Sequence, residues 1–304
     1  MTRFFWLIRR EIWEHKAIWV APAVVLGCIL LLLLTGRVHL GPYDGTAGGL
    51  PTHFTHEERI ALLMLAYAGL AVVVFLVMGI IAFFYSIDSL YADRRDRSVL
   101  FWKSLPLSDA ETVLSKFATA IVVIPLVALV AAVISQFVVA AGASMQFGST
   151  GLPTDLVWNP QAIFGGIGIA MLWCVTAMLW YAPFVGYLML ASAWAPRGPF
   201  LWAVLPPVGA WILEKVVMRS DYIGDFITER LFALYFLLRN RGPSGASDLS
   251  DDEVAGEVSK LAQIDIPGML ADFYTSPELW FGVVAAGLLL AAAMWVRRYR
   301  DETA

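Results

Sequence analysis

The residues that could do chemistry in this sequence begin with one histidine-rich segment. His39, His53 and His56 lie close to the acidic pair Glu57 and Glu58, in a stretch rich in glycine, proline and threonine. His53 and His56 could meet on one face of a helix, which would create a possible metal site. Matches this short are common by chance, so solvated loop histidines are the simpler interpretation, and we expect no metal site.

The motifs that define common catalytic sites are absent from the sequence. There is no G-x-x-x-x-G-K-[ST] segment, so we expect no P-loop ATP site on this chain. The H-E-x-x-H pattern that begins at His56 fails at Ile60, and there is no G-x-S-x-G elbow. An intramembrane enzyme would need a catalytic Ser/His, Asp/Asp or His/Glu set at membrane depth, and none is found. We therefore predict that the chain is not an enzyme and has no cofactor of its own.

The composition indicates a membrane protein. Of 304 residues, 59% are hydrophobic and only 15% are charged, whereas soluble domains have about 25% charged residues. Several apolar runs reach ~20 residues, enough to cross a hydrocarbon core of ~30 Å as helices. The alternating pattern of a membrane β-barrel is absent. We predict an all-α polytopic protein whose 304 residues form a single transmembrane domain.

Six spans are predicted from these runs. They are about Ala17–Thr35, Glu57–Ile87, Ala110–Ala141, Gln161–Ala193, Phe200–Val217 and Pro277–Val296. Asn159 and Pro160 supply an N-cap and an N1 proline for the fourth span. Pro183 predicts a kink in that span, and the adjacent Pro206 and Pro207 predict a break or a re-entrant geometry in the fifth.

The distribution of lysine and arginine predicts the orientation. These residues are frequent before the first span, in residues 91–116 and after the last span, whereas the first outer loop has only Arg37 and Arg59. The positive-inside rule then places both termini and residues 91–116 in the cytoplasm, and we expect a multi-pass protein of a bacterial inner membrane. Residues 1–16 combine apolar residues at helical spacing with basic residues, which predicts an interfacial helix.

The longest charged interruption between the early spans runs from Tyr91 to Lys116. Positive-inside bias explains Arg94 and Arg95, but it does not explain an apolar patch, Val99 to Trp102, in a loop that should be polar. Docking on the membrane surface could account for the patch. A protein partner accounts for both the patch and the sharp stop at Leu105-Pro106-Leu107. Ser108 and Glu111 then form an S-x-x-E capping box that starts the next helix.

This stretch resembles the first cytoplasmic loop of ABC-2 type transporter permeases. The matching parts are Asp93-Arg94-Arg95-Asp96-Arg97, the short coupling helix Val99–Lys103, the turn Ser104-Leu105-Pro106-Leu107-Ser108, and Lys116. Ile8-Arg9-Arg10-Glu11 is similar to the interfacial entry helix of that family, and the six-span layout agrees over the whole chain. One departure is that the Gly-Thr often found before the coupling helix is Arg97-Ser98 here.

The resemblance implies a permease subunit of an ATP-binding cassette exporter. A separate cytoplasmic subunit would bind ATP and Mg²⁺, dock on the coupling helix and drive the second span, and two permease chains would pair as a homodimer or heterodimer in the lipid bilayer. No nucleic acid is expected as a partner. The implied coupling residues are Arg94, Arg95, Val99, Leu100, Phe101, Trp102, Ser104, Leu105 and Pro106, and those of the interfacial helix are Arg9, Arg10 and Glu11.

One alternative uses the polar region before the last span. Residues 218–277 contain more acidic than basic residues and are expected on the outer side of the membrane. A membrane scaffold could bind a partner protein through this region. The sequence does not name a cargo for the transporter interpretation.

Overall fold

The computed structural model describes residues 2–35, 56–96, 107–150, 154–155, 157–228, 230, 271 and 273–300, and its regular structure in these ranges is entirely helical. The helices are α1 (Thr2–Glu14), α2 (Ala17–Leu34), α3 (His56–Arg95), α5 (Asp109–Ala118), α6 (Ile124–Thr150), α7 (Pro160–Trp180), α8 (Ala182–Trp194), α9 (Pro199–Leu213) and α13 (Pro277–Arg300). Two π-helical turns complete the set: η1 (Thr119–Val123) joins α5 to α6, and η2 (Glu214–Met218) follows α9. The predicted all-α class is confirmed.

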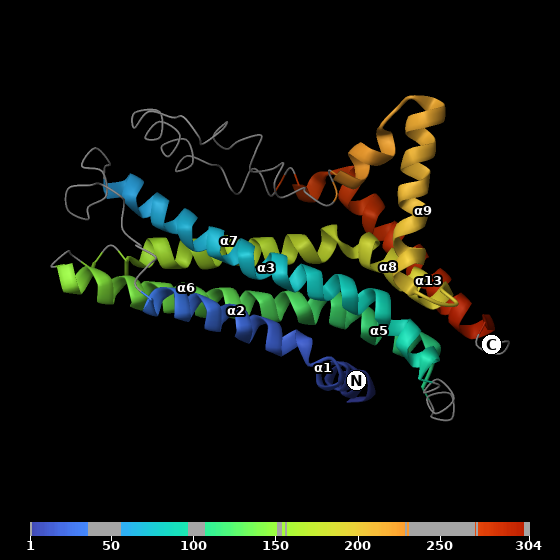
Figure 1. Cartoon of the computed structure of the whole chain (residues 1–304), viewed down its shortest axis with the longest axis horizontal. Helices are drawn as coiled ribbons and strands as arrows, with labels where there is room; N and C mark the ends of the chain where they lie inside the picture. Colours follow the sequence, from blue (N-terminus) through green and yellow to red (C-terminus); the bar gives the residue numbers. More distant parts are fainter. Residues whose placement is uncertain are drawn as a thin grey trace.

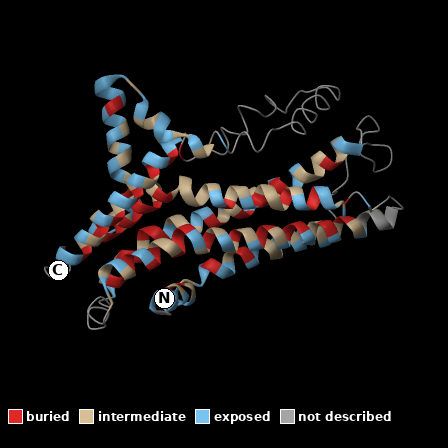
Figure 2. Cartoon of the chain, turned by 180° about the vertical axis from the view of Figure 1, so that it is seen from behind, coloured by how far each residue is buried: buried red, intermediate tan, exposed pale blue. Residues whose placement is uncertain are grey.

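In the part of the chain that the structure describes, six helical segments are long and apolar enough to cross a membrane, which agrees with the predicted number of spans. They are Ala17–Leu34, Arg59–Arg95, Asp109–Met145, Pro160–Trp180, Pro199–Met218 and Pro277–Tyr299. Many large apolar side chains on the outside of the bundle are exposed, as expected of surfaces that face lipid (Figure 2). The chain is therefore a multi-pass membrane protein.

Two predicted helix starts are confirmed in detail. The Ser108 hydroxyl accepts a hydrogen bond from the Glu111 backbone N–H at 3.1 Å, while the Glu111 carboxylate accepts one from the Ser108 N–H at 2.9 Å. At α7, the Asn159 side chain accepts hydrogen bonds from the backbone of Gln161 and Ala162. Both signals are local in sequence, because each pairs groups within one helical turn.

The prolines of the fourth and fifth spans behave differently. The fourth span breaks at Tyr181, so that Pro183 falls in the first turn of α8 rather than inside a helix. By contrast α9 continues through Pro206 and Pro207, and the predicted break is absent. Pro207 cannot donate to the carbonyl of Ala203, four residues earlier. The hydroxyl of Tyr187 on α8 donates to that carbonyl instead, at 2.9 Å, so a neighbouring helix satisfies the freed group.

The centre of the bundle is α3, which packs against α6, α7 and α8 (Figure 1). Small residues permit the closest approaches between helices. A Cβ atom at Gly186 on α8 would lie 3.4 Å from the carbonyl oxygen of Ala286 on α13, and these two helices lie side by side. The main buried cluster contains many alanines, which lets long apolar helices approach one another without gaps.

Replacing Gly166 with alanine is expected to destabilise the contact between α3 and α7. A Cβ atom at this position would lie 2.8 Å from Tyr67 Cβ and 3.4 Å from Gln136 Nε2, so the neighbours must shift. We expect a loss of about 1–3 kcal/mol in the free energy of unfolding, measured by thermal unfolding of the purified chain in detergent. Gly168→Ala on the same helix is the control, since nothing lies within 4 Å of its Cβ position. Equal melting temperatures for the two variants would contradict this account.

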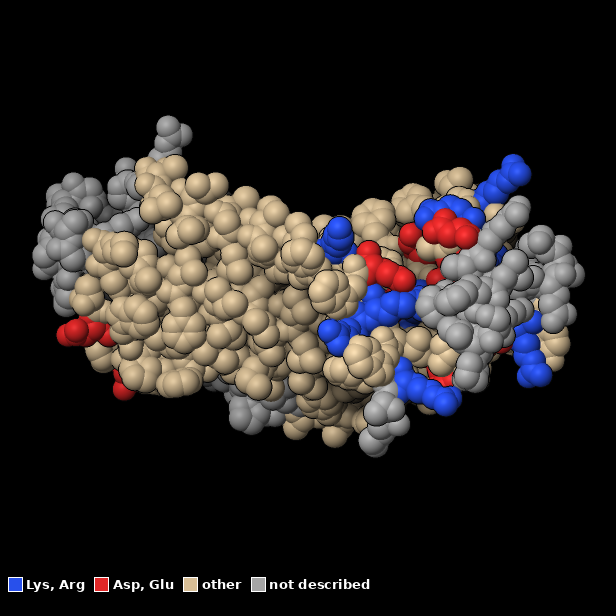
Figure 3. All heavy atoms as spheres, turned by 90° about the horizontal axis from the view of Figure 1, so that it is seen from below, with Lys and Arg blue, Asp and Glu red and all other residues tan. Residues whose placement is uncertain are grey.

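One end of the bundle collects segments that are far apart in sequence. α1, the end of α3, the start of α5 and the end of α13 all lie at the end where both chain termini are found (Figure 1). α1 is seen almost along its own axis in this view, so it runs across the bundle rather than along it. Figure 3 shows that most Lys, Arg, Asp and Glu side chains on the face in view gather at this end. The assignment of this end to the cytoplasm stays a prediction.

Candidate functional site

A buried carboxylate on α1 is the centre of the charged end of the bundle. The side chain of Glu11 is only 2% exposed. Its oxygens lie 3.0 and 3.2 Å from Lys116 Nζ on α5 and 3.1 Å from Arg10 Nη2. The Tyr85 hydroxyl on α3 donates to the same carboxylate at 2.9 Å. Glu11 therefore joins α1 to both helices that flank residues 97–106.

A second carboxylate extends the cluster to the last helix. Asp93 on α3 lies 3.4 Å from Lys116 Nζ and 3.0 Å from Arg297 Nη1 on α13. Arg297 Nε also lies 3.2 Å from an oxygen of Asp109, the first residue of α5. We call Glu11, Asp93, Asp109, Lys116 and Arg297 the charge cluster. It connects four helices that are brought together only by the tertiary fold.

The burial of this cluster has a large energetic consequence. Removing an ion from water costs several kcal/mol, and only close pairing with full hydrogen bonding offsets that cost. Lys116 and Arg297 are each almost completely buried, and each bonds two carboxylates. Since a buried ion pair is seldom a net source of stability, its main effect here is to fix the relative positions of α1, α3, α5 and α13.

A group of hydrogen bonds made by Ser192 and Arg94, which we call the joint, connects the same end of α3 to α8. The Ser192 hydroxyl accepts hydrogen bonds from the backbone N–H groups of Leu90 and Tyr91, at 3.1 and 3.0 Å. The guanidinium of Arg94 donates to the carbonyls of Ser192 and Ala195, at 2.6 and 3.0 Å, at the C-terminus of α8. A cation at this position also suits the negative end of the helix dipole. The end of α3 is thereby bonded to α8.

Replacing Ser192 with alanine is expected to weaken this joint. The N–H groups of Leu90 and Tyr91 lie inside α3 and keep their intrahelical acceptors, so loss of the Ser192 hydroxyl should cost about 0.5–1.5 kcal/mol. The melting temperature in detergent would fall accordingly. Ser135 is also completely buried, but its hydroxyl donates to the Ala132 carbonyl within its own helix. Ser135→Ala is therefore the control. A melting temperature for Ser192→Ala equal to that of the control would show that the joint contributes nothing.

The structure divides the predicted site residues into three groups. Arg9 and Arg95 are exposed, with Arg9 stacked over Trp6 and Arg95 paired with Asp96 at 3.0 Å. Arg10, Glu11 and Arg94 are less exposed, and they also bond to groups of the chain. The remaining predicted coupling residues, Val99, Leu100, Phe101, Trp102, Ser104, Leu105 and Pro106, lie outside the residues that the structure describes.

Sequence reasoning missed three members of this site. Arg297 was predicted only as a basic flank that sets orientation, and no role was predicted for Tyr85 or Asp109. Tyr85 lies in an apolar run where a single hydroxyl gives no local signal, and Asp109 follows a helix cap where an acidic residue is common. Lys116 was part of the family resemblance, but its two carboxylate partners could not be identified from their spacing in the sequence.

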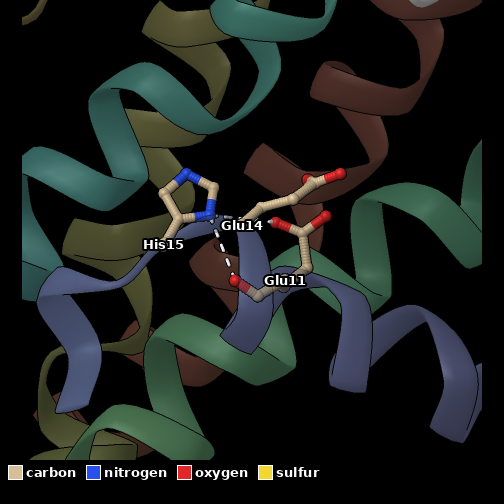
Figure 4. Close-up of side chains that lie close together, drawn as sticks. All are labelled: Glu11, Glu14 and His15. Atoms are coloured by element: carbon tan, nitrogen blue, oxygen red, sulfur yellow. Dashed lines mark hydrogen bonds and ion pairs between the residues drawn. The ribbon is translucent and has the colours of Figure 1, made fainter.

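Three potential metal ligands also lie near this site. Glu11, Glu14 and His15 have ligand atoms within 4.8 Å of one another (Figure 4). Lys116 and Arg10 already pair with the Glu11 carboxylate, and Arg10 pairs with Glu14 at 3.0 Å. His15 Nδ1 lies 3.2 Å from the Glu11 carbonyl, which accounts for that ring nitrogen. The arrangement is thus explained by ion pairs within the chain.

The histidines near the start of the second span are only partly described. His56 is the first residue of α3 and is exposed, whereas His39 and His53 lie outside the described residues. The expectation that these histidines bind no metal stays a prediction.

Comparison with known proteins supports the class of membrane protein that the fold indicates. Residues 59–181 match the model of a family described as ABC-2 family transporter protein. No curated protein matches the chain. No solved structure matches it either.

The family match supports an ABC-2 type permease, and it confirms the resemblance seen in the sequence. It covers less than half of the chain, from the start of α3 to the end of α7. Tyr85, Asp93, Asp109 and Lys116 lie within the matched residues, whereas Glu11 and Arg297 lie outside them. A permease of this family is a membrane component of an ATP-binding cassette transporter and is not itself the catalytic part.

Proposed function

We propose that this chain is the permease subunit of an ATP-binding cassette exporter driven by a separate ATPase. The ATPase would dock on residues 97–106, the predicted coupling loop between α3 and α5, and ATP and Mg²⁺ would be bound on that partner. The observation that carries the proposal is the charge cluster, which fixes the segments on both sides of this loop. Asp93 lies near the end of α3, and Asp109 begins α5. A force applied to the loop would therefore act on a joined set of helices.

The cluster supports transmission of force because its links are short and buried. Within the cluster, Glu11 links α1 to the helices that flank residues 97–106, and Arg297 links α13 to the same helices. Outside the cluster, Ser192 bonds the end of α3 to α8. Packed and hydrogen-bonded elements move together, whereas an isolated loop would absorb a displacement. The proposal thus assigns α1, α3, α5, α8 and α13 to one unit at the end predicted to face the cytoplasm.

Pairing of two permease chains is part of the same proposal, and α9 supports it. Its N-terminal part contacts the bundle through Phe200, Trp202 and Ala203. Beyond Ala203 its large apolar side chains are exposed on several sides: Leu205, Val208, Ile212, Leu213, Val216, Val217 and Met218, the last three on η2. In Figure 1, α9 extends away from the other helices. A second chain would cover part of this surface, and lipid would cover the rest.

The first test is purification of the tagged full chain from its native membranes, with identification of the proteins that accompany it. We expect an ATP-binding cassette protein and an ATP hydrolysis activity that a tagged, unrelated six-span protein does not capture. A chain that is captured alone would contradict the proposal. Capture of outer-face proteins alone would favour the scaffold function, in which residues 218–277 bind the partner.

A further inference from the structure

We propose that Arg297 is a positioning residue that clamps together the two segments flanking residues 97–106. The importance of that loop rests on the proposed function. The clamp itself is a contact within this chain, so it can be tested without the ATPase. It assigns to the last helix a part in coupling that the family resemblance gives only to the second span.

The geometry of one guanidinium group carries the proposal. Arg297 Nη1 lies 3.0 Å from Asp93 Oδ2, and Arg297 Nε lies 3.2 Å from Asp109 Oδ1. Asp93 belongs to the last turn of α3 and Asp109 is the first residue of α5. These two carboxylates therefore precede and follow residues 97–106 in the sequence. A single side chain, distant in sequence from both, bridges them.

Arginine is suited to this bridge because its planar guanidinium presents several donors in a fixed arrangement. A lysine at this position would have one cationic nitrogen on a flexible stem, and it could not reproduce both contacts with the same geometry. The side chain of Arg297 is 4% exposed, and that of Asp93 is 8% exposed. Little water reaches this pair, so its two partners are held in a defined orientation rather than loosely attracted.

The clamp also provides a second route into the membrane. α13 packs along α8, with the close approach at Gly186 and Ala286. A displacement of the end of α3 would reach α13 through the pair between Asp93 and Arg297. It would reach α8 through the hydrogen bonds between α3 and Ser192. A displacement of residues 97–106 would then move α3, α8 and α13, rather than α3 alone.

The test measures the separation of the two flanking segments in the purified full-length chain. Spin labels are placed at Asp96→Cys and Ala110→Cys, which are both exposed positions, after Cys28 and Cys174 are replaced by alanine. We expect one narrow distance distribution in the background protein. Arg297→Gln should abolish that single narrow peak, and Arg297→Lys should not restore it. Arg298→Gln, an exposed neighbour with the same change in charge, should leave the peak intact.

Asp109→Asn keeps the proposal testable if Arg297→Gln does not fold. It removes one end of the bridge at a partly exposed position and leaves the pair between Arg297 and Asp93. We expect it to broaden the distance distribution while the melting temperature stays near that of the Arg298→Gln control. An unchanged peak in a folded Arg297→Gln or Asp109→Asn variant would overturn the clamp. Equal loss of the peak in Arg298→Gln would also overturn it.

The same variants separate the clamp from the proposed function. If the unmodified chain captures no ATP-binding protein, the proposed function fails, and the distance measurement still decides whether the clamp exists. If the ATPase is captured, Arg297→Gln should still bind it, because the docking residues are unchanged. The ATPase bound to the Arg297→Gln permease should hydrolyse ATP at the rate of the isolated ATPase.

Discussion

Simultaneous replacement of Phe101 and Trp102 with alanine is expected to release the ATP-binding subunit while the permease still inserts into the membrane. Large aromatic anchors in a docking segment contribute a disproportionate share of binding energy. Loss of two such anchors should weaken binding roughly a hundredfold or more, which uncouples transport from ATP hydrolysis. Co-purification of the ATPase with the tagged variant measures the effect, and the amount of variant in the membrane fraction is determined in parallel.

A second aromatic pair in the chain provides the control for that experiment. Trp280 and Phe281 are both exposed and lie near the start of α13, whereas the charge cluster lies near its other end. Their double alanine variant loses the same kind of apolar surface and should retain the ATPase. If both variants capture it equally well, or if the Phe101 and Trp102 variant transports normally, docking must occur elsewhere.

Replacement of Lys116 with methionine is expected to have the largest effect on stability. The change would remove one cation from two buried carboxylates, Glu11 and Asp93, and no water could replace it without reopening the site. Removal of one partner of a buried pair typically costs about 3–5 kcal/mol, because the remaining charge stays buried. The melting temperature of the purified chain should fall accordingly, and the yield of folded protein should fall with it.

Two further variants separate the lost charge from lost packing. Lys215 pairs with Asp221 at 3.1 Å, but both side chains are well exposed. An exposed pair is worth only about 0–1 kcal/mol, so Lys215→Met should have little effect. Glu11→Gln combined with Lys116→Met should be more stable than Lys116→Met alone, since the side chain at position 11 then no longer carries a buried charge that has lost its pair with Lys116. If Lys116→Met and Lys215→Met have the same melting temperature, the buried cluster has no structural role.

These variants test different steps of one mechanism. The Phe101 and Trp102 variant tests the contact with the partner, while the Arg297 variants test how the loop is held. Lys116→Met tests whether the buried cluster holds the helices in place at all. A chain with intact docking residues and a disrupted cluster should bind the ATPase but transmit its motion poorly. Such a result would show that the ends of the helices act as a unit during transport.

Much of the fold could be predicted from the sequence because the signals are local. An apolar run of about 20 residues must be helical in a membrane, since its backbone groups have no water to bind. The six spans, the Ser108 cap and the Asn159 cap follow from such short-range rules, and the structure confirms all of them. The break predicted at Pro206 and Pro207 was wrong because a residue on another helix, Tyr187, satisfies the freed carbonyl.

The candidate site shows the opposite behaviour. Glu11, Asp93, Lys116 and Arg297 are separated by between about 20 and 290 positions, and each one alone resembles an ordinary charged residue at the end of a span. Arg10, predicted as part of the interfacial helix, and Arg94, predicted as a coupling residue, both bond to groups within the chain, and their roles stay predictions. The segments that cross the membrane can be identified from the sequence alone, because crossing depends on the local transfer of apolar residues from water to lipid. The pairing of charges depends on the tertiary fold, because a buried ion is stabilised by whichever opposite charge the packing of distant helices brings within about 4 Å.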